Sequence, residues 1–273
     1  MSALALSPQL FSIFAGLVEE ACGVHYAAHD RELLGSKLAA CASDRGYDSL
    51  LDYYYRLRYD DPDQVELTQL IEFLLVHETY FFRELRPLQQ LVDGHLHEVI
   101  GARGKARVWS AACSTGEEPF TIAMLLDAKG VLDRVEIIGT DISAQSIAAA
   151  ASGLHRKRAL RDDYPAELGA RYLEAGPGGV AVAPRIRAAV RFHTLNLFDG
   201  DAIARLGRFD AILCRNVLIY FRDDHVVRVL DRLAGALTPD GLLAVGVSES
   251  LLRFGTSLAC EEHGSSFFYR RVS

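Results

Sequence analysis

Residues 108–119, VWSAACSTGEEP, combine the end of a strand, a short loop and the start of a helix. An open α/β sheet binds nucleotide-like ligands at such a loop, and small residues there let the backbone approach a ligand closely. The helix begins with Glu117 and Glu118, where phosphate binders have an anion cradle of backbone N–H groups. Two carboxylates repel a pyrophosphate and suit a ligand that is cationic or rich in hydroxyl groups, although they would also complement the helix dipole.

Polar side chains follow two other predicted strands. Asp141 ends an apolar strand 25 positions after the glycine of that loop, which is the place of a ribose-hydroxyl acceptor, and an N-cap of the next helix is the alternative. A second apolar run, residues 209–214, leads into a segment that carries Arg215, Asn216 and Tyr220. Because ligands bind at the carboxyl ends of parallel strands, these side chains are candidate site residues.

The segment 77–84, HETYFFRE, precedes these strands. Its consecutive aromatic residues predict packing between domains, in which Phe81 and Phe82 would be buried. Arg83 differs, because a guanidinium group among aromatic rings is suited to hold a carboxylate, or the carboxyl group of a cofactor, through paired hydrogen bonds. Arg83 is therefore a candidate for ligand binding.

The elements that position these residues fall into two patterns. Apolar residues at helical spacing predict helices around residues 10–18, 33–41, 50–57 and 65–75, and a further helical stretch at 88–100 leads out of this region. After Gly104, short apolar runs alternate with helical periods, which is typical of a parallel sheet with crossover helices. A small hairpin is expected between residues 172 and 190, and the closing SSFFYRR predicts a terminal antiparallel strand. The strands are expected at 107–112, 135–139, 190–195, 209–214 and 241–247, and the helices at 117–128, 143–151, 201–206 and 223–237.

Composition restricts the class of protein. The 273 residues are 50% hydrophobic with a mean hydropathy of +0.10, which predicts a globular chain with a sizeable core. No run approaches the roughly 18 apolar residues of a membrane span, and the first residues lack the basic region of a signal peptide. We therefore expect a soluble, cytoplasmic protein. Five widely spaced cysteines without a C-x-x-C pair argue against disulfides and a structural zinc, and we predict no metal site.

Charge is distributed unevenly along the chain, whose formal net charge is -7. The first hundred residues hold 7 Lys and Arg against 16 Asp and Glu, which makes this region a poor partner for nucleic acid or an anionic membrane. A nucleic-acid amino-methyltransferase would also carry an Asp/Asn-Pro-Pro-aromatic motif, whereas the segment after residue 214 has no proline. An NAD-dependent oxidoreductase would need the glycine fingerprint that residues 108–119 lack.

Five motifs, in this order, resemble those of the chemotaxis receptor glutamate methyltransferases, the CheR family. Together they cover nearly the whole chain, and five in register are far more specific than any one alone. The motifs are HETYFFRE (77–84), WSAACSTGEEPFTIAMLL (109–126), GTDIS (139–143), LNLF (195–198) and CRNVLIYF (214–221).

The resemblance implies an α/β fold, the doubly wound Rossmann-like sheet of methyltransferases that use S-adenosylmethionine (SAM). It implies an all-α N-terminal domain at 1–84, a linker helix at 85–104 and a catalytic domain at 105–273 with an inserted β-hairpin at about 172–191. SAM would be the methyl donor and S-adenosylhomocysteine the product. By resemblance the cofactor residues would be His77, Thr79, Arg83, Glu117, Asp141, Asn196, Leu197, Arg215 and Asn216, with Tyr220 beside the methyl group.

The implied reaction methylates γ-carboxylates of glutamates on the helical bundle of chemoreceptors, which adapts bacterial chemosensory signalling. A glutamate with an ordinary pKa near ~4.3 is already ionised at neutral pH, so no general base is needed. Positioning and exclusion of water would carry catalysis, and we assign that role to Arg83 and Tyr220. The alternative is a SAM-binding sensor or adaptor without transferase activity, because fold alone does not fix function.

The sequence departs from the family pattern at three places. The second helix of family members that dock through a basic face carries several arginines, whereas residues 36–45 hold only Lys37 and Arg45. The hairpin is shorter than in members that tether to a receptor's C-terminal peptide, which predicts no such tethering. His77 replaces a common asparagine, and its ring can still donate one hydrogen bond, which would make cofactor binding pH-dependent.

Overall fold

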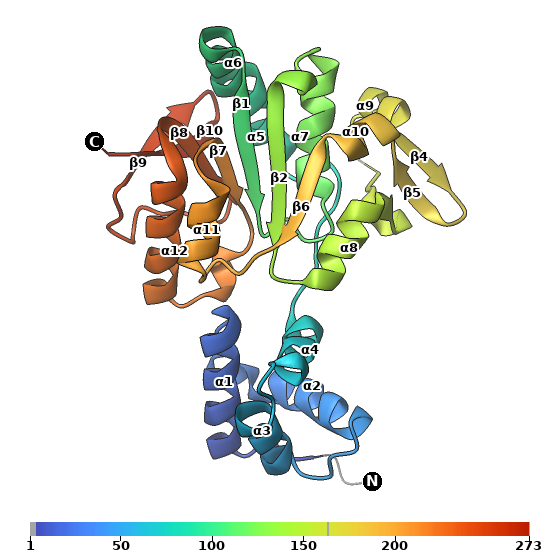
Figure 1. The fold of residues 1–273 in the computed structure, drawn as a ribbon, viewed down its shortest axis with the longest axis vertical. Coiled ribbons are helices and arrows are strands. Elements are labelled where there is room, and N and C mark those ends of the chain that lie inside the picture. Colours follow the sequence, from blue (N-terminus) through green and yellow to red (C-terminus); the bar gives the residue numbers. More distant parts are fainter. Residues whose placement is uncertain (1–3, 163, 273) are drawn as a thin grey trace. The chain divides into compact units, whose positions relative to one another are not determined.

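The computed structural model describes residues 4–162 and 164–272, and its contacts divide the chain into two compact units. One contains the residues up to Val76 together with Tyr220–Arg222, and the other contains His77–Ile219 and the chain from Asp223 onward. Figure 1 shows the course of the chain through both units. Within the described residues, every helix is too short or too polar to cross a bilayer.

Four α-helices form the first unit, as the spacing of its apolar residues predicts. Ser7 is the N-cap of the first helix, and its Oγ accepts the Leu10 N–H at 3.2 Å. Pro8 occupies the first helical position. Gly23 ends it with a φ of 77°, a conformation that glycine adopts without strain. The helices are α1 (Pro8–Cys22), α2 (Arg31–Asp44), α3 (Leu50–Tyr59) and α4 (Val65–Leu74).

A seven-stranded sheet forms the centre of the second unit, in the order β6-β2-β1-β7-β8-β10-β9. The first five strands in that order are parallel, and β10 pairs antiparallel with both β8 and β9. The sequence predicted the parallel strands and β10 but missed β9. The strands are β1 (Ala106–Ala111), β2 (Val135–Asp141), β6 (Val190–Thr194), β7 (Phe209–Cys214), β8 (Leu237–Val245), β9 (Leu258–His263) and β10 (Ser266–Arg271).

Helices accompany this sheet and complete the doubly wound α/β arrangement, which confirms the predicted fold class (Figure 1). Residues 85–103 are helical throughout, with a π-helical stretch at Leu91–Leu96 between two α-helices. That stretch and the almost entirely buried α7 contribute to one core with the sheet. The α-helices are α5 (Leu85–Gln90), α6 (His97–Arg103), α7 (Glu117–Ala128), α8 (Ala144–Ser152), α11 (Gly200–Leu206) and α12 (Asp223–Ala236).

A small antiparallel sheet, in the order β3-β5-β4, is inserted between α8 and β6. Its hairpin lies where the sequence predicts one. Gly179 starts β5 with a φ of 133°, and a Cβ there would lie 2.0 Å from the His155 carbonyl oxygen, so only glycine fits. The elements are β3 (Leu154–His155), α9 (Ala166–Tyr172), β4 (Leu173–Gly176), β5 (Gly179–Val182) and α10 (Pro184–Ala188).

Candidate functional site

The loop between β1 and α7, residues 112–116, is strained and tightly packed. Ala112, Ser114 and Gly116 have φ values of 58°, 50° and 91°, and two of these three are not glycine. A Cβ on Gly116 would lie 2.8 Å from the Ala150 Cβ. The hydroxyl of Ser114 is buried and has no hydrogen-bond partner among the residues that the structure describes. Strain of this kind is typical of functional loops, and a buried unpartnered hydroxyl is suited to a ligand contact.

Asp141 fixes this loop from the end of the neighbouring strand β2. Its Oδ2 accepts the Ser114 N–H at 2.7 Å and its Oδ1 accepts the Ser143 N–H at 2.9 Å. Its backbone carbonyl accepts the Leu195 N–H at 2.8 Å. Asp141 therefore joins the three loops that follow β1, β2 and β6.

The loop after β6 holds two further predicted residues. Asn196 is half-buried, and its Oδ1 accepts the Phe198 N–H at 3.0 Å. Leu197 is buried, and its carbonyl accepts a hydrogen bond from Arg232 at 3.0 Å. Through Leu195 this loop lies next to Asp141, so the structure brings these three predicted residues to one edge of the sheet.

Residues 77–84, which precede β1 in the chain, also reach this edge of the sheet. The His77 ring Nδ1 lies 3.0 Å from the Ser146 Oγ in the first turn of α8, directly after the Asp141 loop. Thr79 is half-buried. Arg83 is also half-buried, and its guanidinium donates to the Glu78 carbonyl at 2.8 Å and lies 5.7 Å from the centre of the Tyr80 ring.

Arg215 is the centre of a buried ion-pair cluster, with its side chain only 2% exposed. Its Nη1 donates to the Glu118 carboxylate at 2.7 Å, and its Nη2 donates to the Glu84 carboxylate at 2.8 Å and to the Arg83 carbonyl at 3.0 Å. The Glu118 carboxylate also accepts the Ser110 hydroxyl at 2.6 Å. Arg215 thus joins β7, the start of α7 and residues 77–84 through one guanidinium group.

The charges in this cluster shift one another's pKa values. Burial alone would raise the pKa of Glu84, but the hydrogen bonds and charge of Arg215 outweigh it and lower that pKa below the ordinary carboxyl value. Burial alone would lower the pKa of Arg215, but the nearby charge of Glu118 and the contacts with Glu84 raise it. Both partners are therefore held in their charged forms at neutral pH.

Asn216 is held beside this cluster in a left-handed conformation, with a φ of 59°. Its N–H donates to the Glu249 carboxylate at 2.7 Å, which also accepts the N–H groups of Ile219 and Gly246. Its side-chain amide donates to Glu84 at 3.3 Å. A buried carboxylate that accepts three backbone N–H groups fixes the loops after β7 and β8 together.

Glu117 and Glu118 are neighbours in sequence but bind different partners. The Glu117 carboxylate is 3% exposed, accepts the Thr115 hydroxyl at 2.7 Å and lies 3.0 Å from the Nδ1 of His155 on β3. The His155 Nε2 is buried, and no described residue forms a hydrogen bond with it. The pair joins the inserted sheet to the start of α7.

Tyr220 belongs to the helical unit by its contacts. Its carbonyl accepts the His25 N–H at 2.8 Å, and the next residue, Phe221, pairs with Val24 in an isolated β-bridge. The other predicted site residues, from His77 to Asn216, belong to the second unit. No group of three or more metal-ligating side chains occurs in the part of the chain that the structure describes.

Three structurally important residues were not singled out from the sequence. Glu84 lies inside the HETYFFRE motif, and a carboxylate beside Arg83 was the only available signal. Glu249 and His155 carry no spacing that links them to Asn216 or Glu117, because their partners are 33 and 38 residues away.

The donor set of this edge fits a ligand with hydroxyl groups and a positive charge. The Asp141 carboxylate accepts hydrogen bonds, the buried Ser114 hydroxyl is unpartnered, and the helix that follows begins with two carboxylates. Arg215, which pairs with Glu118 at this helix start, is also bound by Glu84, so it does not form an anion cradle. A sulfonium nucleoside such as SAM matches this chemistry, whereas a pyrophosphate does not.

Comparisons with known proteins agree with this chemistry. Residues 77–264 match the family described as CheR methyltransferase, SAM binding domain, and residues 9–75 match its all-alpha domain. The chain is 36% identical to chemotaxis protein methyltransferase 1 of Pseudomonas aeruginosa and 33% identical to a chemotaxis protein methyltransferase of Vibrio parahaemolyticus. A relative from Vibrio anguillarum with the same description is 32% identical. In each case the match covers 92% of this chain and 92% of the relative.

Proposed function

The chain belongs to the CheR methyltransferase family, and we propose that it transfers the methyl group of SAM to glutamate γ-carboxylates of chemoreceptors through the site at the ends of β1, β2, β6 and β7. Asp141 is the observation that carries the proposal. Its carboxylate follows β2, the usual position of a ribose-hydroxyl acceptor in such sheets, and it fixes the strained loop between β1 and α7.

When bound, SAM supplies an electrophilic methyl group on a positively charged sulfur. Asp141 would accept the ribose hydroxyls, and Asn196 and Leu197 would contact the base from the loop after β6. Glu117, whose carboxylate contacts His155, would favour the positive charge of SAM. His77 and Thr79 would border the site from residues 77–84. We propose that Arg215 and Asn216 act mainly as positioning residues, because their side chains bind Glu84 and Glu118.

The acceptor glutamate needs no deprotonation, because a carboxylate is already ionised at neutral pH. The chain's task is to orient one carboxylate oxygen in line with the methyl group and to exclude water. We propose that the Arg83 guanidinium holds the incoming carboxylate, since only one of its N–H groups is engaged by the Glu78 carbonyl. The Tyr220 hydroxyl is proposed to assist it beside the methyl group.

The proposed substrate segment is the cytoplasmic helical bundle of a chemoreceptor, so the reaction would take place in the cytoplasm. The alternative is a SAM-binding sensor or adaptor without transferase activity. Calorimetric titration with SAM and S-adenosylhomocysteine, followed by incubation with labelled SAM and a receptor fragment, separates the two. Binding of both compounds with transfer of label supports the enzyme, and binding without transfer supports the adaptor.

Arg83→Ala and Tyr220→Phe are expected to lower kcat for methyl transfer by about 100-fold each, because a misplaced acceptor loses the in-line geometry. SAM affinity is expected to change much less than kcat. Steady-state kinetics with a receptor fragment, together with calorimetry for SAM, measure both quantities. Full activity in both variants with unchanged SAM affinity would show that neither residue positions the acceptor.

A peptide copying a receptor's C-terminal tail is expected to bind this chain weakly or not at all. The two strands of the hairpin, Leu173–Gly176 and Gly179–Val182, are four residues each, which leaves a short edge for an added strand. Fluorescence anisotropy of a labelled tail peptide measures this binding. A dissociation constant in the low micromolar range would contradict the prediction.

A further inference from the structure

The substrate's chemistry demands a basic surface, and the two cations at residues 36–45 of α2 are already bound to other groups of the helical unit. A helix that presents several unmethylated glutamates is anionic at neutral pH. On α2 the Lys37 ammonium donates to the Leu74 carbonyl at 3.0 Å, and the Arg45 guanidinium pairs with Glu66 at 2.6 Å and Gln69 at 2.9 Å. The two cations of residues 36–45 are therefore engaged within their own unit.

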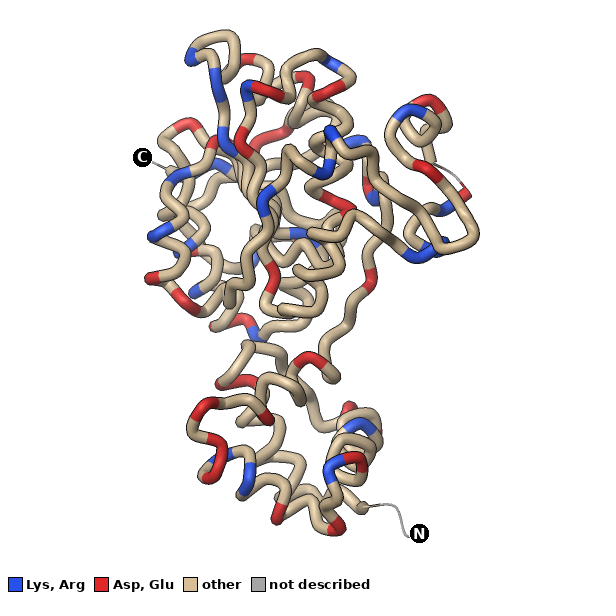
Figure 2. The backbone as a smooth tube through the Cα atoms, turned by 45° about the vertical axis from the view of Figure 1, so that its right-hand side comes forward, with Lys and Arg blue, Asp and Glu red and all other residues tan. Residues whose placement is uncertain are grey.

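A cationic segment occurs instead in the second unit, at residues 156–161, RKRALR. Arg156, Lys157 and Arg158 are all exposed, and among residues 4–162 and 164–272 none of the three has an acidic partner. They lie directly after β3, where Lys157–Ala159 form a short 3-10 helix. The wider stretch from 151 to 191 holds eight Lys and Arg against four Asp and Glu. Figure 2 shows blue segments gathered on this part of the chain.

This segment is anchored directly to the residues that border the candidate site. The Phe81 N–H donates to the Ala159 carbonyl at 2.8 Å. The Arg161 guanidinium lies 3.6 Å from the centre of the Tyr80 ring and pairs with Glu78 at 3.2 Å. The cationic segment thus packs against residues 77–84, which carry His77, Thr79 and Arg83.

We propose that Arg156, Lys157 and Arg158 form the docking surface for the acidic receptor helix that carries the methylated glutamates. The proposal rests on the function proposed above. A helix held on this surface lies next to residues 77–84, so its glutamates reach the site without contact to a basic α2. Because each methylation removes one negative charge from the substrate, the surface also favours receptors with free carboxylates over methylated ones.

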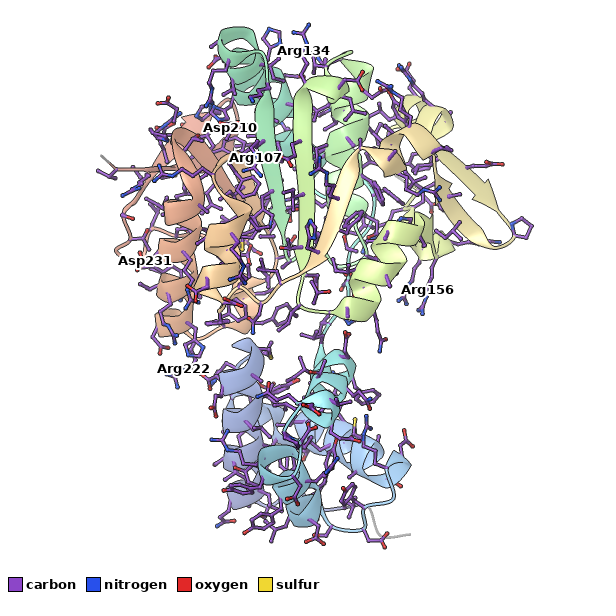
Figure 3. All side chains as sticks on the ribbon, viewed as in Figure 1. Arg107, Arg134, Arg156, Asp210, Arg222 and Asp231 are labelled. Atoms are coloured by element: carbon purple, nitrogen blue, oxygen red, sulfur yellow. The ribbon has the colours of Figure 1, made fainter. Side chains whose placement is uncertain are left out.

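The test uses the triple variant Arg156→Glu, Lys157→Glu, Arg158→Glu in the full chain. The matched control is Lys105→Glu, Arg134→Glu, Arg208→Glu, which makes the same charge change at exposed residues just before β1, β2 and β7. Figure 3 shows Arg134 and Arg156 at well-separated places on this unit. Calorimetry measures the affinity for a receptor cytoplasmic fragment with unmodified glutamates and, separately, for SAM.

We expect the triple variant to bind the receptor fragment about tenfold more weakly at low ionic strength, with a smaller salt dependence than the wild type. The control variant should bind like the wild type, and SAM affinity should be equal in all three proteins. Equal weakening in both variants, no weakening in either, or no binding of the fragment by the wild type would overturn the proposal. So would loss of SAM binding in the triple variant alone.

Calorimetry measures receptor binding without methyl transfer, so this test of the docking surface is independent of the test of the reaction. If the wild type binds the fragment but transfers no label, the proposed transferase activity is wrong. The proposed docking surface is then judged by the measured affinities alone. A wild type that methylates with a KM unaffected by the triple variant contradicts the docking surface and leaves the transferase intact.

Discussion

Arg215→Met is expected to lower the free energy of unfolding by about 3–5 kcal/mol, the usual cost of removing one partner from a buried ion pair. Methionine fills most of the volume but leaves the half-buried Glu84 and Glu118 carboxylates without their cation. Urea unfolding followed by circular dichroism measures the change. The control is Arg191→Met, whose side chain is 70% exposed beside Glu136, where we expect a loss below about 1 kcal/mol.

The pH dependence of this loss has a definite sign. The pKa of Glu84 is lowered in the folded chain, chiefly because the contacts with Arg215 outweigh burial. A lowered carboxyl pKa contributes stability above the ordinary value, and that contribution disappears as the pH falls through the folded-state pKa. The difference between the wild type and Arg215→Met should therefore be largest near neutral pH and shrink in acid. A difference that grows as the pH falls would contradict the ion-pair account.

Asp141→Ala is expected to weaken SAM binding by about 100-fold or more, because hydrogen bonds to a charged group contribute about 1.5–3 kcal/mol each and two would be lost. The loss of the Ser114 and Ser143 contacts would also loosen the loop between β1 and α7. Calorimetric titration with SAM and S-adenosylhomocysteine measures the effect on both compounds.

The matched control is Asp201→Ala, an exposed aspartate in the first turn of α11, which should bind SAM like the wild type. Circular dichroism shows whether each variant is folded. A folded Asp141→Ala variant that binds SAM as tightly as the wild type would rule out Asp141 as the acceptor of the ribose hydroxyls.

The sequence predicts the parts of the fold that follow from local periodicity. Short apolar runs predicted the parallel strands, and the predicted helix at 117–128 coincides with α7 because a buried helix with polar ends has sharp boundaries. Strand β9 was missed because LACEEH is mostly exposed and has no apolar run. Its pairing with β10 depends on contacts that a local pattern does not contain.

A site residue was predictable from the sequence when it directly follows a strand. It was not predictable when its role depends on a partner far away in the sequence. Asp141 was found because the end of β2 is also the end of an apolar run. Whether Glu117 or Glu118 would bind Arg215 was not predictable, since neighbouring residues on a helix point about 100° apart and the partner lies 97 residues later. The roles of Glu84 and His155 likewise depend on long-range contacts.

The most direct test of the central claim is the chemical form of the transferred methyl group. A receptor cytoplasmic fragment is incubated with the wild-type chain and methyl-labelled SAM, and the isolated fragment is then treated with mild base. The account predicts that label enters the fragment, leaves it as a volatile product in base, and is absent when the acceptor glutamates are replaced with alanine. Label that stays on the fragment in base, or that enters the alanine fragment equally, would show that glutamate carboxylates are not the acceptors.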